Sequence, residues 1–148
     1  MRFMILRKAD KDTEAYVMPS EELLTAMGKY MEDLSKAGVL LGGEGLHPSA
    51  KSARVKFAKG KPTVTDGPFT ETKELIAGYT MIQVKSLKEA LEWARRWPTL
   101  DANGGVELEV RQVFEAEDFG EEFTPEMRKK EEKMRAEAER RQKKGSKP

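Results

Sequence analysis

The sequence contains no cysteine and only one histidine, His47. Without cysteine the chain has no disulfide framework, no thiolate metal site and no cysteine nucleophile, and this composition fits a reducing compartment. A single histidine also excludes any metal centre that needs two imidazole ligands. We therefore expect no metal site.

Long apolar runs and a net charge of one sign are missing as well. The N-terminal stretch becomes charged at Arg7 before a signal-peptide core could form, and no apolar segment approaches membrane-spanning length. The 27 basic and 26 acidic residues give a net charge of +1, which provides no overall field to attract nucleic acid or an anionic membrane. We expect a cytoplasmic protein with one core in its 148 residues, and neither a membrane nor a nucleic-acid partner.

Apolar residues recur at helical and at strand spacings. Ser20 is the expected N-cap of a helix that ends at Gly38, with an apolar face of Leu23, Leu24, Met27, Tyr30, Met31 and Leu34. A second helix begins at the capping box Ser86–Glu89 and ends before Pro98. Strands are expected at residues 3–6, 39–46, 53–58, 62–65, 76–84 and 106–114.

This order of elements predicts an α+β fold, a ferredoxin-like β-α-β-β-α-β sandwich with an extra central hairpin. If Gly60-Lys61 is the hairpin turn, Phe57 faces Val64, and Asp66 returns towards the loop that holds His47. Two helices cover only one sheet face, so the other face is expected to pair with a second copy, giving a dimeric α+β barrel. Loops 46–52 and 66–74 would then rim its cavity.

The C-terminal part, residues 115–148, differs in kind from the domain at 1–114. Thr124-Pro125 is a good helix start, but Met127 and Met134 are almost the only apolar side chains that follow. We expect a solvated helix or a frayed tail. A basic arm for nucleic acid is the alternative, although the interleaved glutamates cancel most of its charge.

The motif Asp66-Gly67-Pro68-Phe69 lies near the middle of the chain and predicts a tight turn, because glycine accepts a positive φ and proline fixes its own. The polar residues 70–74 follow on what should be a rigid loop, and such loops often carry functional sites. The alternative is that Asp66 caps the turn while Phe69 plugs the core.

Two other patterns do not indicate a cofactor. The glycine-rich segment 39–46 lacks the lysine and the hydroxyl residue of a nucleotide phosphate loop. Met27 and Met31 are expected to fill the core. We predict no cofactor.

Several motifs resemble the DGPF group of the YciI-like (YCII-related) family over residues 1–114. They are the 66–69 motif with Glu71, Lys73 and Glu74, then Gly78-Tyr79, the helix 89–94 ending at Pro98, and Glu109-Val110-Arg111; Leu46-His47-Pro48 is also similar. Gln112 departs from the pattern, because the family usually has a proline there, and the charged tail is extra. The resemblance implies a dimeric α+β barrel with a ligand-sized cavity.

The resemblance also implies a histidine and aspartate pair, which here would be His47 and Asp66. A carboxylate beside an imidazole selects its tautomer and raises its basicity, which would make a general base. Glu71 and Lys73 would lie at the cavity mouth, with Arg111 as an anion clamp. The alternative is a solvated histidine and a turn-capping aspartate.

Two function classes remain open at this point. One is an enzyme or a small-molecule-binding homodimer. The other is a non-catalytic regulatory or interaction module, since DGPF domains are also known beside sigma-factor-like transcription proteins. The chain has no helix-turn-helix pattern and no basic face, which disfavours direct reading of DNA.

Overall fold

The computed structural model describes residues 1–146. The chain divides into two compact units, residues 1–113 and residues 114–148, and each is described by itself. Within residues 1–146, no helix has both the length and the apolar character needed to cross a membrane.

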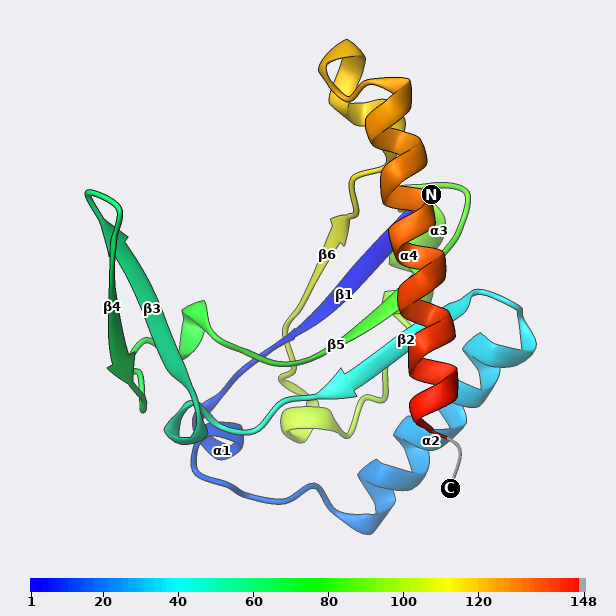
Figure 1. Ribbon diagram of the computed structural model, residues 1–148. Coiled ribbons are helices and arrows are strands. Elements are labelled where there is room, and N and C mark those ends of the chain that lie inside the picture. Colours follow the sequence, from blue (N-terminus) through cyan, green and yellow to red (C-terminus); the bar gives the residue numbers. More distant parts are fainter. Residues whose placement is uncertain (147–148) are drawn as a thin grey trace. The chain divides into compact units, whose positions relative to one another are not determined.

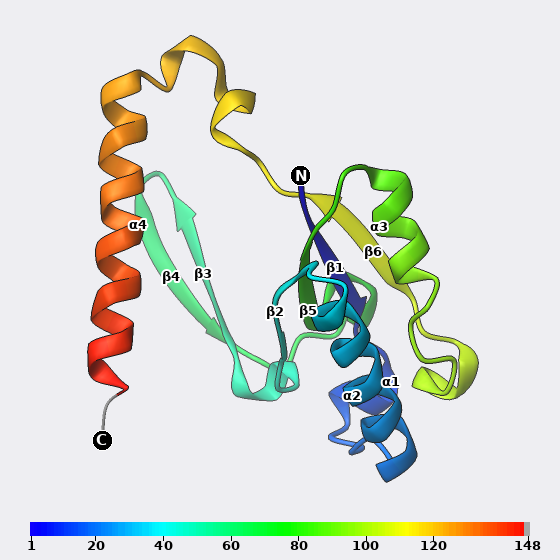
Figure 2. The same ribbon diagram turned by 90° about the vertical axis from the view of Figure 1, so that its right-hand side faces the viewer.

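The first unit is built on a four-stranded antiparallel sheet (Figure 1). Its strands are β1 (Arg2–Lys8), β2 (Leu40–Gly45), β5 (Ile76–Gln83) and β6 (Leu108–Gln112), in the order β2-β5-β1-β6. Two helices, α2 (Glu21–Lys36) and α3 (Leu87–Ala94), pack on one face of the sheet (Figure 2). This strand order is that of a ferredoxin-like sandwich, so the predicted fold class is confirmed.

Both helices begin at the predicted caps. The Leu23 amide donates to the Ser20 side chain, and the Glu89 amide donates to that of Ser86, each at 3.1 Å. Gly38, with φ +73°, lies just beyond the end of α2, where a left-handed residue commonly terminates a helix. Leu24 is 58% exposed and does not join the helix's buried face.

The core lies between these helices and the inward face of the sheet. Alternation along β1 places Phe3 and Ile5 on that face, next to Ile82 of β5 and Leu34 of α2, and all four are completely buried. Tyr30 packs against Trp97 with ring centroids 5.3 Å apart, and its hydroxyl donates to the Trp93 carbonyl oxygen at 3.0 Å. Burial raises the pKa of Tyr30 to about 12.

The extra hairpin forms, but its register differs from the prediction. Strands β3 (Ala53–Ala58) and β4 (Lys61–Asp66) pair with Ala58 opposite Lys61, so the turn is Lys59-Gly60 and not Gly60-Lys61. Both turn residues have positive φ, +50° and +78°, as a type I′ turn requires, and glycine suits the second position. Phe57 therefore faces Pro62, and Asp66 faces Ala53. The hairpin extends away from the four-stranded sheet (Figure 1), and all its strand residues are exposed.

A short helix that the sequence did not predict follows β1. This helix, α1 (Lys11–Glu14), begins with a reciprocal cap: the Thr13 amide donates to the Asp10 carboxylate at 2.8 Å, and the Asp10 amide donates to the Thr13 hydroxyl at 2.9 Å. It positions Glu14 and Tyr16, which both belong to the site described below.

The second unit contains α4 (Pro125–Gly145), which begins after the N-cap Thr124. None of the residues of α4 is buried, as the polar sequence led us to expect. Before α4, the rings of Phe114, Phe119 and Phe123 contact one another in sequence, with centroids 5.1 and 5.6 Å apart.

Candidate functional site

A cleft of about 770 Å³ opens on the helix-covered side of the first unit. Its walls come from residues 12–20, the first turns of α2, the ends of β2 and β5, and the segment after α3. Much of this wall is apolar, with contributions from Val17, Leu23, Met27, Met31 and Leu46. The volume lies within the range of small-molecule sites. Met27 and Met31, expected in the core, line the cleft as well as packing against the core.

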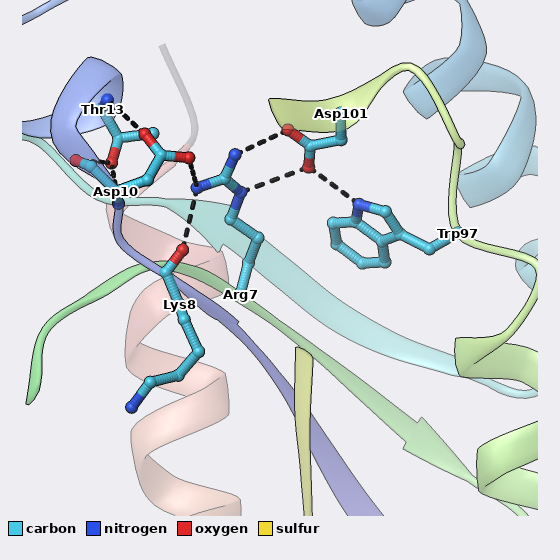
Figure 3. A network of polar contacts seen from close by, with 6 residues as sticks. All are labelled: Arg7, Lys8, Asp10, Thr13, Trp97 and Asp101. Atoms are coloured by element: carbon cyan, nitrogen blue, oxygen red, sulfur yellow. Dashed lines mark hydrogen bonds and ion pairs between the residues drawn. The ribbon is translucent and has the colours of Figure 1, made fainter. Parts of the chain in front are cut away.

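The cleft floor contains a buried ion pair between Arg7 of β1 and Asp101 (Figure 3). Arg7 Nε donates to Asp101 Oδ2 at 3.2 Å and Arg7 Nη2 donates to Oδ1 at 2.6 Å, a bidentate arrangement. Trp97 Nε1 also donates to Asp101 Oδ2, at 2.8 Å. Arg7 is 9% exposed and Asp101 6%. Each charge therefore has its partners within the protein.

A second carboxylate, that of Asp10, holds the other side of the guanidinium. Arg7 Nη1 donates to Asp10 Oδ2 at 3.0 Å and to the Lys8 carbonyl oxygen at 2.8 Å. Burial alone would raise the pKa of Asp101, but the hydrogen bonds from Arg7 and Trp97 and the charge of Arg7 lower it overall. The same balance lowers the pKa of Asp10, where the Thr13 amide and Arg7 outweigh burial. Two carboxylates thus balance a single guanidinium.

The sequence contains a signal for the burial of Arg7. Arg7 continues the inward alternation of Phe3 and Ile5, so its side chain had to enter the interior and find a partner there. Asp101 had no comparable signal, because it follows Pro98 in a polar turn that looks like a surface loop.

The predicted site residue His47 lies at the rim of the cleft. It is exposed, and its ring centroid is 6.1 Å from that of Tyr16, another lining residue. The segment 46–48 forms this rim. The second loop, 66–74, contributes no lining residue, so Asp66, Glu71 and Lys73 are not part of the cleft wall.

The 66–69 motif instead docks on the segment that follows His47. The Gly67 amide donates to the Ser52 carbonyl oxygen at 2.8 Å, and the Phe69 amide donates to Ser49 Oγ at 2.9 Å. A Cβ at Gly67 would collide with the Ser49 carbonyl oxygen, so only glycine permits this approach. Within residues 1–146 the Asp66 carboxylate has no hydrogen bond or ion pair. No hydrogen bond joins Asp66 to His47 in the described part of the chain, and the proposed pair stays a prediction.

Ser49 connects this motif to α1. Its Oγ donates to Glu14 Oε2 at 2.5 Å, and its amide donates to both Glu14 carboxylate oxygens at 3.1 and 3.2 Å. Ser49 is 6% exposed. We call the set Glu14, Ser49, Gly67 and Phe69 the Ser49 brace. It joins α1, the segment that follows His47 and the 66–69 motif. The motif thus holds the backbone next to the cleft without lining the cleft itself.

Phe69 does not plug the core, which corrects one of the two interpretations of the motif. The ring is half-buried outside the core, with the Arg54 guanidinium 3.7 Å from its centroid. Pro68 follows a cis peptide bond, and the short helix Thr72–Glu74 carries Lys73 on the surface. Because the Ser49 brace holds the Phe69 backbone against Ser49, the Phe69 ring lies against Arg54 of the hairpin.

Arg111 lies on the other side of the sheet. It pairs with Met4 in register, and residues at these positions point away from Phe3 and Ile5, towards the sheet face opposite α2 and α3. Its side chain is 71% exposed, and Nη1 is 4.0 Å from Glu109 Oε2. Arg111 therefore cannot clamp an anion in this cleft. In the described part of the chain, no group of three or more acidic or histidine side chains could hold a metal ion.

Comparisons with known proteins agree with the expected family. The sequence matches the family model of the YCII-related domain over residues 1–117. An uncharacterised protein of Rhizobium meliloti (strain 1021) is 38% identical over 103 residues, which are 70% of this chain and 77% of that protein.

A solved structure is similar at lower sequence identity. It is the 5-chloro-2-hydroxyhydroquinone dehydrochlorinase TftG from Burkholderia phenoliruptrix in complex with 2,5-dihydroxybenzoquinone, with 17% identity, a TM-score of 0.44, and coverage of 80% of this chain and 98% of that one. The family match spans most of the sequence. The chain belongs to the YCII-related family.

Proposed function

We propose that this chain is a small-molecule-binding protein with an enzyme-like site, and that the site is the cleft beside Arg7. The observation that carries this proposal is the combination of an apolar wall with an ion pair on the floor of a cavity of about 770 Å³. Ligand sites commonly combine an apolar lining with a few fixed polar groups. The paired floor also means that the site is formed before a ligand arrives.

His47 is the proposed proton-transfer group. It lies at the cleft rim, and an imidazole can accept or donate a proton near neutral pH. The Ser49 brace supports this role, because it fixes the backbone two residues after His47. Asp66 stays the proposed partner of His47.

The proposed assembly is a homodimer through the uncovered sheet face. Met4 and Leu6 of β1 alternate with the buried residues of that strand and pair with Met81 and Tyr79 of β5. These four apolar or aromatic side chains would be partly wetted in a monomer, and a second copy would cover them. Light scattering at micromolar concentration should give twice the chain mass. A monomer, or a Met81→Glu variant with unchanged mass, would contradict the interface.

A fragment screen read by two-dimensional amide NMR tests the site. Small apolar fragments should shift resonances of Tyr16, His47 and the neighbouring Leu46, because these residues line the cleft. His47→Ala should retain fragment binding while abolishing any turnover, which separates the binding claim from the enzymatic one. Hits confined to residues 66–74 would contradict the cleft as the site.

A second candidate function rests on the hairpin. Val55, Phe57 and Val64 are 56 to 66% exposed, and pairing brings Val55 opposite Val64. An apolar hairpin face of this kind also suits a regulatory or interaction module of the sort associated with sigma-factor-type transcription control. This candidate gains support if no fragment binds the cleft and Phe57→Ser abolishes a protein interaction without changing the melting temperature.

A further inference from the structure

One polar side chain on the cleft floor has no hydrogen-bond partner within the protein. Thr80 of β5 is 3% exposed and lines the cleft, yet among residues 1–146 no hydrogen bond of its hydroxyl is found. No completely enclosed side-chain nitrogen or oxygen in this part of the chain lacks a partner. The Thr80 hydroxyl must therefore reach the cleft, the open space that Thr80 borders. A buried hydroxyl is costly unless it is hydrogen-bonded, which points to an occupant.

Arg7 supplies a donor on the same sheet face as this hydroxyl. Its guanidinium has five N–H groups, of which Nε uses one, Nη1 two and Nη2 one in the contacts to Asp101, Asp10 and Lys8. One N–H on Nη2 remains. Arg7 pairs with Gly78, and Ile5 pairs with Thr80, so Arg7 and Thr80 are diagonal neighbours on the same inward sheet face. The backbones of such diagonal pairs lie about 7 Å apart. One ligand oxygen can accept from both side chains if their donor atoms lie within about 6 Å of each other, which neighbouring positions on one sheet face allow.

The charges of the cleft exclude an anionic ligand. Its ionic lining consists of one cation, Arg7, and three carboxylates, those of Asp10, Asp12 and Asp101. Glu44 also borders the cleft, but it pairs with Tyr79 and so directs its side chain to the opposite sheet face. Two of these carboxylates already neutralise Arg7. A ligand carboxylate would therefore meet a net negative field while gaining only one hydrogen bond from Arg7.

We infer that the cleft binds a small uncharged molecule with an apolar body, whose carbonyl or hydroxyl oxygen accepts hydrogen bonds from Thr80 Oγ1 and Arg7 Nη2. This inference rests on the proposed function and adds the chemical class of its ligand. The apolar wall formed by Met27, Met31 and Leu23 receives the body of the molecule, and the sheet floor fixes its oxygen. Thr80 is then a ligand-binding residue, and Arg7 binds through its single unused donor.

The experiment compares acetophenone and benzoate, which share a ring and a similar size but differ in charge. Each is titrated into the full-length protein and followed by amide NMR shifts at Tyr16, His47 and Thr80. Thr80→Val removes the hydroxyl and keeps the branched shape, and Thr80→Ser keeps the hydroxyl as the matched control. The melting temperature and the amide spectrum of each variant report whether it is folded.

Acetophenone should bind the wild-type cleft, and benzoate should bind it at least tenfold more weakly. Thr80→Val should weaken acetophenone binding by about three- to tenfold, the range for one neutral hydrogen bond, and Thr80→Ser should stay within about threefold of wild type. Equal or tighter binding of benzoate overturns the inference without requiring any variant.

Unchanged acetophenone affinity in a folded Thr80→Val also overturns the inference, but leaves the cleft as a ligand site. If neither probe shifts a cleft resonance up to its solubility limit, the proposed function and the inference fail together. The two failures are therefore distinguishable by whether acetophenone shifts Tyr16 and His47.

Discussion

The cleft floor and the 66–74 loop both carry ionisable residues, but their environments are opposite. Asp101 is 6% exposed and accepts three hydrogen bonds from the side chains of Arg7 and Trp97, whereas Asp66 is exposed and has no such partner in the described structure. The loop contains the recognisable 66–69 sequence motif, whereas the floor contains the buried side chains whose hydrogen bonds are formed within the protein. A polar cluster on a rigid turn can therefore serve as a support, while the site forms where buried charges must be paired.

Replacing Asp101 or Asp66 by alanine, one at a time, should give the largest difference in the free energy of unfolding. Asp101→Ala leaves the Arg7 guanidinium and the Trp97 indole N–H without their shared acceptor, so we expect a loss of about 3 kcal/mol in the free energy of unfolding. Asp66→Ala should change it by less than about 0.5 kcal/mol, as for other exposed positions. Urea denaturation measures both. Equal losses in the two variants would remove the distinction between the regions.

Low pH should weaken the ion pairs of the cleft floor and so lower the stability of the fold. The pKa values of Asp101 and Asp10 are lowered in the folded state, so the stabilisation they provide is complete above their unfolded pKa of about 4 and is lost as the pH falls below it. The urea midpoint of wild type should thus fall between pH 5 and pH 3. The slope should be shallower in Asp101→Ala than in wild type. Parallel slopes for the two proteins would show that this ion pair is not the cause.

A substitution at Gly67 should disrupt the Ser49 brace. Gly67→Ala forces a Cβ against the Ser49 carbonyl oxygen, which should cost about 1–3 kcal/mol through a forced backbone shift. Gly45→Ala is the matched control, because nothing lies within 4 Å of a Cβ built there. Thermal unfolding would show the difference. If both variants melt alike, the motif does not dock on Ser49.

The hydroxyl of Ser49 should contribute a smaller amount to the free energy of unfolding. Ser49→Ala removes the donor to Glu14 and the acceptor of the Phe69 amide, so we expect a loss of about 1–2 kcal/mol. Ser35→Ala, at an exposed position of α2, should be neutral or slightly stabilising. Amide hydrogen exchange of Phe69 gives a direct readout, since its protection should be lost only in Ser49→Ala.

The C-terminal unit should matter least for the stability of the domain. We propose that residues 1–114 fold independently, because α4 has no buried residue and the chain divides at residue 113. A protein truncated after residue 117 should melt within about 3 °C of the full chain. A truncated chain that does not fold would show that the tail belongs to the domain.

The fold was largely predictable because its signals are local. The caps Ser20 and Ser86, the glycine after α2 and the alternation of β1 each define an element without long-range information. The hairpin register was wrong by two residues, because a positive φ at Lys59 cannot be inferred from a residue type that rarely adopts it.

The site was predictable only in part. His47 was a candidate because it is the sole histidine and because Leu46-His47-Pro48 resembles a family motif; it lies at the cleft rim, and its role stays a prediction. The Arg7–Asp101 pair joins residues 94 positions apart, and Thr80 becomes visible as an unpaired hydroxyl only when its neighbours are placed. Such pairings depend on the sheet register, which a single sequence does not specify.

A crystal structure of the full chain soaked with acetophenone tests most directly whether the ligand site is the cleft floor or the motif loop. We expect ligand density against Met27 and Met31, with the carbonyl oxygen within about 3.2 Å of Thr80 Oγ1 and of Arg7 Nη2. Density at residues 66–74 with an empty cleft would contradict this expectation.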